Sequence, residues 1–275
     1  MAEPAEIPEH EADGEIAALY DDIKTATGVG MVNLIYRRMA TVPGQLAWAW
    51  GTVRPLFADG DIGRARTAMV AALDLPPVLP ISRPALAVVG VDGAGEASIG
   101  QIIDAYNRGN SGNLFALSAL ATFLDSGAEA PAEPGSAAPA PARPPDLPPI
   151  VALAEMDWAL ADLVRDMSAP VAPPGRPMIP SLYRHLALWP GFLALAATTM
   201  LPHQQGGAVA RLAGALHRQA VAEAPALAAR LRTPAATTPP SGAAREELIA
   251  TFRAYGQGPI ATMIVIGHML RRALP

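Results

Sequence analysis

YRRMATVPGQL, at residues 36–46, recurs as YRHLALWPGFL at residues 183–193. The two segments share Tyr, Arg, Ala, Pro, Gly and Leu at matching positions. A second pair, AYNRG at residues 105–109 and AYGQG at residues 254–258, has nearly the same separation along the chain. Two independent matches at one spacing indicate an internal duplication. We therefore expect two tandem homologous modules that form a pseudo-dimer within one chain.

A low-complexity stretch separates the two copies. Residues 126–149, SGAEAPAEPGSAAPAPARPPDLPP, consist mostly of Ala and Pro and favour an extended chain without a core of its own. The predicted organisation is a first helical repeat at residues 1–125, an Ala/Pro-rich linker at 126–149 and a second helical repeat at 150–275.

Both repeats are expected to be all-α. Apolar residues make up 51% of the chain and aromatic residues only 5%, a composition that suits closely packed helices better than a β-sandwich. Ile16, Leu19, Tyr20 and Ile23 recur at helical spacing. The pattern predicts helices at residues 15–25, 31–41, from 45, 65–73, near 85, 98–106 and 113–124, and the carboxyl half repeats this order.

Composition excludes several functional classes. The chain has no cysteine, which rules out disulfides, thiolate metal sites and thiol redox catalysis. The net charge is −5, and the 20 Lys and Arg residues form no stripe, so no nucleic-acid partner is expected. The five histidines lack the spacing of a metal site, and we expect no cofactor or metal.

The chain is also expected to be cytoplasmic and to have no membrane contact. Its acidic amino-terminal segment lacks the basic start and apolar stretch of a secretory signal. The longest apolar runs are well short of the ~20 residues that a bilayer-spanning helix needs. The sequence leaves open whether two chains form a homodimer.

Two Gly-rich runs could contact ligands. GVDGAG at residues 90–95 could form a dinucleotide-binding loop, but no βαβ pattern surrounds it, and a loop that caps the following helix is favoured. The run from Tyr106 to Asn113 carries Asn107, Asn110 and Asn113 before an apolar stretch. It predicts a helix start where amide groups cap the helix and contact a ligand carboxylate.

Arg37 and Arg184 are repeat mates in otherwise apolar helices. A buried guanidinium needs partners, because burying it alone costs several kcal/mol. The sequence leaves two alternatives open. Each arginine makes a structural ion pair or helix-end contact, or one of them supplies positive potential for an anionic substrate.

Over nearly its whole length the chain resembles the group I 2-haloacid dehalogenases, also called the halocarboxylic acid dehydrogenase family. The resemblance rests on Gly14, Glu15, Tyr20, Asp22 and Ile23, on ATVPG at 40–44, NRGN at 107–110, Trp189-Pro190, and Tyr255 with His268. It implies an all-helical pseudo-dimer with a small-molecule carboxylate pocket between the modules. It also implies hydrolysis of short 2-halocarboxylates by direct attack of water, which an aspartate activates.

The resemblance assigns roles to individual residues. The family's amide contact falls on Asn110, its serine beside the acid on Ser181 and its pocket tyrosine on Tyr255. The aromatic pair of the pocket wall falls on Met31 and Leu34, so that the wall stays apolar without being aromatic.

The position of the family's catalytic aspartate is Leu182. Leucine cannot accept a proton, so the catalytic residue is unknown, and His185, three residues on, is the candidate base. Two functions therefore remain open: a 2-haloacid dehalogenase-like hydrolase with a relocated base, and a non-dehalogenating homologue that binds a small carboxylate or apolar metabolite. A helical decarboxylase of the carboxymuconolactone type is disfavoured, because its redox version needs a Cys-x-x-Cys pair.

Overall fold

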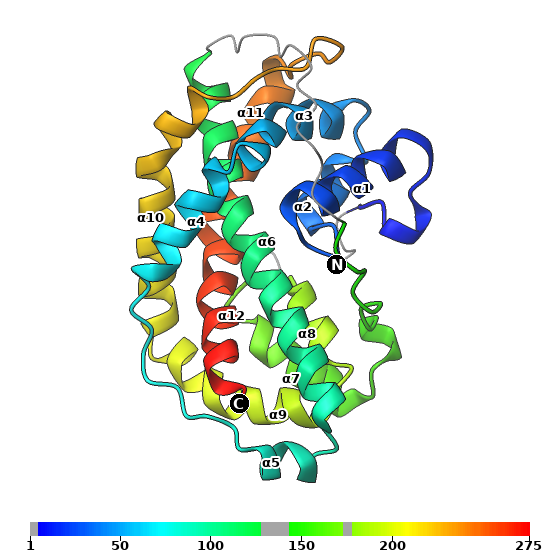
Figure 1. Ribbon diagram of the computed structural model, residues 1–275, viewed down its shortest axis with the longest axis vertical. Helices are drawn as coiled ribbons and strands as arrows, with labels where there is room; N and C mark the ends of the chain where they lie inside the picture. The colour runs from blue at the N-terminus through cyan, green and yellow to red at the C-terminus, as the bar shows by residue number, and fades with distance from the viewer. Residues whose placement is uncertain (1–4, 128–142, 173–177) are drawn as a thin grey trace. The chain divides into compact units, whose positions relative to one another are not determined.

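The structure, a computed structural model, describes residues 5–127, 143–172 and 178–275. In these ranges the chain forms α-helices and short 3₁₀ and π turns joined by loops, and no β-strand occurs in them (Figure 1). The all-α class expected from composition and periodicity is confirmed. In the part of the chain that is described, no helix has the length and apolar character to cross a membrane.

The chain divides into two compact units. Unit 1 comprises Met1–Ala72, Ser111–Asp146 and His217–Gly256, and unit 2 comprises Leu73–Asn110, Leu147–Leu216 and Gln257–Pro275. Each unit takes segments from both predicted sequence repeats. The repeat boundaries stay a prediction, and residues 128–142 of the expected linker lie outside the described ranges.

Unit 1 is built around helix α3 (Gln45–Ala58), which packs against α1 (Gly14–Thr27), α2 (Leu34–Met39) and α4 (Asp61–Ala71). In Figure 1 their colours run from blue for α1 and α2, through lighter blue for α3, to cyan for α4. The unit also contains the 3₁₀ turn Glu9–Glu11, α11 (Gly242–Tyr255) and parts of α6 (Gly93–Ser126) and α10 (Ala208–Ala228).

Aromatic side chains fill the centre of unit 1. Tyr36 meets Trp50 edge to face, with ring centroids 5.7 Å apart, and Trp50 lies 5.5 Å from Phe57. Trp48 is also fully buried. Each of these large rings buries more apolar area than an aliphatic side chain, although the chain has few of them.

Asp22 joins α1 to α3 through a charged contact. Its Oδ2 atom accepts hydrogen bonds from Trp50 Nε1 at 2.7 Å and Arg54 Nε at 2.7 Å, and its Oδ1 atom accepts one from Arg54 Nη2 at 2.9 Å. Burial raises the pKa of Asp22, but the hydrogen bonds from Arg54 and Trp50 lower it by more, so the net pKa lies below its ordinary value.

Unit 2 is built around α9 (Pro190–Gln205), which packs against α7 (Trp158–Ser168), α8 (Ser181–Leu186) and α12 (Ala261–Ala273). It also contains the 3₁₀ turn Leu153–Glu155 and α5 (Arg83–Val88), as well as the first parts of α6 and α10. As the repeated order of helices predicts, the carboxyl half ends in a buried apolar helix, α12, which corresponds to the helix expected at residues 113–124.

Helix α6 differs from the prediction. Separate helices were expected at residues 98–106 and 113–124, but one helix of 34 residues runs from Gly93 to Ser126. The run from Tyr106 to Asn113 therefore lies inside a helix, and the prediction that it forms a helix start is wrong. Gly112 explains part of this result, because a Cβ atom there would lie 3.2 Å from the Phe57 ring, so the glycine serves close packing.

Two further predictions can be compared with the structure. The expected cap at residues 90–95 is confirmed, since Asp92 Oδ1 accepts a hydrogen bond from the Gly95 backbone N–H at 2.8 Å at the start of α6. The helix predicted at residues 31–41 is shorter, Leu34–Met39, so Met31 lies in the loop before it.

The Pro-Gly step of the repeated motif has different roles in the two copies. Gly44 precedes α3 with a φ of 72°, a left-handed conformation that favours glycine. Gly191 lies within α9, where a Cβ atom would come within 2.5 Å of Val89 Cβ and 2.6 Å of the Val89 carbonyl oxygen. Glycine at this position allows the chain at the end of α5 to approach α9 closely.

We predict that Gly191→Ala lowers the free energy of unfolding by about 1–3 kcal/mol, because the added methyl group overlaps the Val89 backbone. Urea denaturation measures the change. Gly63→Ala in α4 is the matched control, since no atom lies within 4 Å of its added Cβ. The control should gain about 0.5–1 kcal/mol from higher helix propensity. Equal stability of the two variants would contradict the close contact.

Asp22→Asn tests the α1–α3 contact. Because folding lowers the pKa of Asp22, its carboxylate stabilises the protein above the unfolded-state pKa of about 4, and this contribution is lost as the pH falls through the lower folded-state pKa. The stability deficit of Asp22→Asn should therefore be largest near neutral pH and shrink on acidification. Denaturant titrations at several pH values measure it, and a deficit independent of pH would contradict this account.

Candidate functional site

The residues singled out from the sequence fall into two groups, one in each unit. Unit 1 contains Met31, Leu34, Arg37 and Tyr255, and unit 2 contains Asn110, Ser181, Leu182, Arg184 and His185.

In unit 2, the ring of His185 joins α8 to α6. The ring is 3% exposed, with Nε2 2.5 Å from the Pro148 carbonyl oxygen and Nδ1 2.8 Å from the Tyr106 hydroxyl. A carbonyl can only accept a hydrogen bond, so Nε2 carries a proton, and when the ring is neutral Nδ1 accepts from Tyr106. The lone pair that a general base would use is therefore already engaged.

Tyr106 was quoted from the sequence only as part of the repeat, and its role as the partner of His185 was missed. Its ring lies 5.6 Å from the His185 ring at an interplanar angle of 71°. The repeated AYNRG segment was the one available signal, because a duplicated tyrosine suggests a duplicated contact.

Asn110 and the start of α8 lie near this contact. Asn110 follows Tyr106 by one helical turn on α6 and therefore shares its face. Ser181 and Leu182 come one turn before His185 in the short helix α8. Leu182 is 1% exposed and belongs to the core of unit 2. Leu182 itself offers no ionisable group.

Arg37 and Arg184 make matching contacts in their own units. The Ile7 backbone N–H donates to the Arg37 carbonyl oxygen at 3.1 Å, and the Val151 N–H donates to the Arg184 carbonyl oxygen at 3.3 Å. Arg37 Nε lies 3.0 Å from Glu6 Oε2, and Arg184 Nε donates to the Val151 carbonyl oxygen at 3.0 Å.

Each arginine therefore holds an earlier segment of the chain, around Ile7 or Val151, against its own short helix. The structural alternative accounts for these contacts of both residues. A role for either arginine in attracting an anionic substrate stays a prediction.

In unit 1, Tyr255 is the last residue of α11 and contacts α2. Its hydroxyl accepts a hydrogen bond from the Arg38 guanidinium, and Arg38 Cζ lies 5.4 Å from the centroid of the Tyr255 ring. Such a cation–π contact holds the ring in a fixed orientation. A π turn, Gly256–Ile260, follows at once, and turns of this kind are frequent at functional sites.

Asn113 has a structural contact in the same unit. Its Oδ1 atom accepts a hydrogen bond from the Tyr36 hydroxyl at 2.8 Å, and both side chains are buried. Burial raises the pKa of the Tyr36 hydroxyl above its ordinary range, so this group stays a donor. Asn113 therefore links α2 to the middle of α6, where a helix-start ligand contact had been predicted.

Met31 and Leu34, assigned to the pocket wall by resemblance, lie at the entrance to α2. Met31 is buried in the loop before the helix, and Leu34, the first helical residue, is partly exposed. Neither residue offers a polar group. Their part in a binding site stays a prediction.

Comparison with known proteins gives consistent results. No protein-family model matches the chain. The (R)-2-haloacid dehalogenase of Rhizobium sp. (strain NHG3) is 28% identical over 222 residues, which cover 78% of this chain and 85% of that protein.

Two solved structures share the fold. The crystal structure of a D-2-haloacid dehalogenase mutant matches with a TM-score of 0.76 and 22% identity over 99% of this chain and 97% of that one. A D-2-haloacid dehalogenase in complex with L-LA matches with a TM-score of 0.73 and the same identity and coverage. The chain is therefore similar in sequence to (R)-2-haloacid dehalogenases and shares the all-helical fold of the D-2-haloacid dehalogenases.

Proposed function

We propose that this chain binds a short carboxylate that carries a substituent at carbon 2, and that it does not release halide from such a compound. The ligand class is supported by the names of the relatives and by the solved structure of one of them with L-LA. The observation that carries the proposal is the presence of Leu182 at the position that the family resemblance gives to the catalytic aspartate.

The chemistry of direct hydrolysis explains why this position matters. Water attacks the halogen-bearing carbon only when a general base within hydrogen-bond reach removes its proton, and loss of such a base costs about 100- to 10,000-fold in rate. Leu182 offers no proton acceptor and is buried. Its register in the sequence is fixed by Trp189-Pro190, to which the resemblance runs without a gap.

Binding does not require the missing acid. The Asn110 amide and the Ser181 hydroxyl are hydrogen-bond donors of the kind that a carboxylate accepts. The resemblance also assigns Met31, Leu34 and Tyr255 to binding; all three belong to unit 1, and Met31 and Leu34 offer only apolar surface. The polar residues that the resemblance assigns to binding, Asn110 and Ser181, are therefore of the expected type, whereas the position that it assigns to the general base is a leucine.

A second function, hydrolysis with His185 as the base, is favoured by the contact between Tyr106 and His185. The Tyr106 hydroxyl lies 2.8 Å from His185 Nδ1. In this arrangement a water molecule would pass its proton to the Tyr106 oxygen while Tyr106 passes its own proton to Nδ1. We rank this function second, because it requires a hydroxyl that already serves a buried structural contact.

We also propose that the chain is an internal pseudo-dimer. The arrangement is supported by two contacts that are repeat mates of each other, Tyr106 with His185 in unit 2 and Tyr255 with Arg38 in unit 1. Each contact joins a residue of one predicted repeat to a residue of the other. Helix α6 begins at Gly93, and α11 begins at its repeat mate Gly242, which gives the same correspondence.

The proposed function predicts stabilisation by ligand. 2-Bromopropionate or lactate at 100 times its dissociation constant should add about 2.7 kcal/mol to the free energy of unfolding. Thermal denaturation with each compound, and with uncharged propionamide as the ligand control, measures this effect. Asn110→Ala should abolish the stabilisation, whereas Thr67→Ala, on the exposed face of α4, should retain it. No stabilisation of the wild type by any carboxylate would overturn the proposal.

His185→Ala separates the two functions. The change removes the contacts to Tyr106 and Pro148 and should lower the free energy of unfolding by about 1–3 kcal/mol, since the buried Tyr106 hydroxyl loses this hydrogen bond. We expect neither this variant nor the wild type to release bromide from 2-bromopropionate. The second function would be established instead if the wild type released bromide, Tyr106→Phe slowed the release and His185→Ala abolished it.

A further inference from the structure

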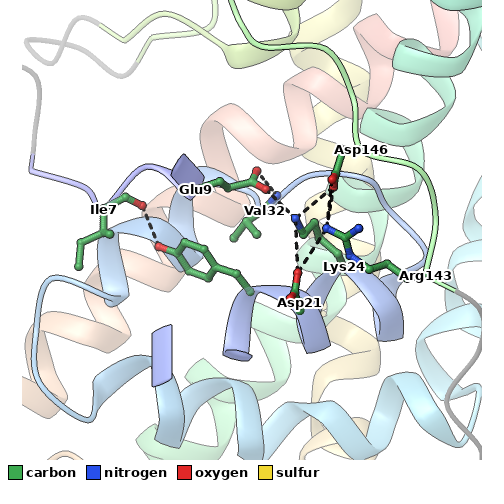
Figure 2. Close-up of polar contacts among 8 residues, drawn as sticks. Ile7, Glu9, Asp21, Lys24, Val32, Arg143 and Asp146 are labelled. Carbon is green, nitrogen blue, oxygen red and sulfur yellow. Dashed lines mark hydrogen bonds and ion pairs between the residues drawn. The ribbon is translucent and has the colours of Figure 1, made fainter. Parts of the chain in front are cut away.

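Lys24, on α1, lies at the centre of a charged cluster in unit 1 (Figure 2). Its side chain is 8% exposed, and its ammonium group lies 3.1 Å from Glu9 Oε2, 3.1 Å from Asp146 Oδ1 and 3.7 Å from Asp21 Oδ1. Burial lowers the pKa of Lys24, but the hydrogen bonds to Asp146 and Glu9 raise it by more, so the net pKa lies above its ordinary value. Lys24 is therefore a charged group surrounded by acceptors.

Glu9 connects Lys24 to the loop before α2. Its Oε2 atom accepts from Lys24, and its Oε1 atom accepts from the Val32 backbone N–H at 2.8 Å. Val32 is the neighbour of Met31 in the α1–α2 loop, residues 28–33. One carboxylate thus connects the buried ammonium to the backbone of the loop that bears a proposed wall residue.

The Glu9 segment is itself held on two sides. The Tyr20 hydroxyl donates to the Ile7 carbonyl oxygen at 2.8 Å, and the Ile7 N–H donates to the Arg37 carbonyl oxygen at 3.1 Å. Burial raises the pKa of Tyr20 to about 12, so its hydroxyl stays a donor. Figure 2 shows Ile7 and Glu9 on one segment, with Glu9 directed toward Lys24.

The other side of the cluster comes from residues near the end of the predicted linker. Arg143 Nη2 lies 2.9 Å from Asp146 Oδ1 and 3.3 Å from Asp21 Oδ1, so Asp146 is shared between Arg143 and Lys24. A Cβ atom on Gly30 would lie 2.0 Å from the Pro145 carbonyl oxygen. The α1–α2 loop is thus in direct contact with this segment.

We propose that Lys24 is a positioning residue, which fixes the α1–α2 loop through Glu9 and thereby sets the affinity of the protein for its carboxylate ligand. Its ammonium group does not bind the ligand itself, because three carboxylates and a second cation already surround it. This inference rests on the proposed function for the identity of the ligand and on unit 1 alone for the position of the loop.

Lys24→Met keeps the length of the side chain and removes its charge. We expect the Val32 amide to exchange its hydrogen about tenfold faster, and the dissociation constant for 2-bromopropionate, measured by calorimetry, to rise about tenfold, as for residues that act on a site through their neighbours. Lys24→Arg should keep both the amide exchange rate and the dissociation constant close to their wild-type values, because it keeps the charge. Arg165→Met, which breaks an exposed ion pair with Asp162 on α7, should change neither.

The outcomes are distinguishable. Unchanged exchange of the Val32 amide in Lys24→Met overturns the inference, and so does faster exchange with unchanged affinity. A wild type that binds no carboxylate overturns the proposed function, and amide exchange then decides alone whether Lys24 positions the loop. If Lys24→Met does not fold, Glu9→Gln gives the same comparison, since Glu9 lies in a short surface turn and contacts the same amide.

Discussion

The contact between the Tyr106 hydroxyl and the His185 ring determines how unit 2 presents its candidate residues. It joins a long helix from one predicted repeat to a six-residue helix from the other. Asn110 lies one helical turn from Tyr106 on α6, and Ser181 and Leu182 lie within one turn of His185 on α8. In unit 1 the corresponding contact joins Tyr255, the repeat mate of Tyr106, to Arg38, the repeat mate of His185. A hydroxyl held by a basic side chain is therefore a recurring element of this fold.

The contacts that hold the short helices do not depend on the side chain at residue 182. Packing and hydrogen bonding around α2 and α8 depend on Tyr36, Tyr183 and the backbone of Arg37 and Arg184. None of these interactions needs a base at residue 182, so replacing an aspartate there by leucine leaves the scaffold intact. Function resides in the site and not in the scaffold. The two arginines likewise serve chain segments, which leaves less positive charge free to attract an anion.

Much of the fold could be predicted from the sequence, because helical spacing and Pro-Gly steps are local signals. The continuity of α6 could not, since Asn and Gly have low helix propensity, and the close fit of Gly112 against Phe57 is a tertiary effect. The composition of the two units was also hidden, because nothing local shows which segments of two similar repeats pack together. For the site, the family resemblance supplied residue positions, but the partner of His185 was missed. The Lys24 cluster joins residues that are far apart in the sequence, so no local sequence pattern predicts it.

Bromide release from the two enantiomers of 2-bromopropionate, by the wild type, Leu182→Asp and Leu182→Asn, tests the central claim most directly. Leu182→Asp supplies a proton acceptor at the position of the missing acid, whereas Leu182→Asn supplies polarity without one. Our account predicts release by Leu182→Asp alone, with circular dichroism confirming that all three proteins are folded. Release by the wild type, or silence from a folded Leu182→Asp variant, would contradict the claim that the absence of an acid at residue 182 separates this chain from its hydrolytic relatives.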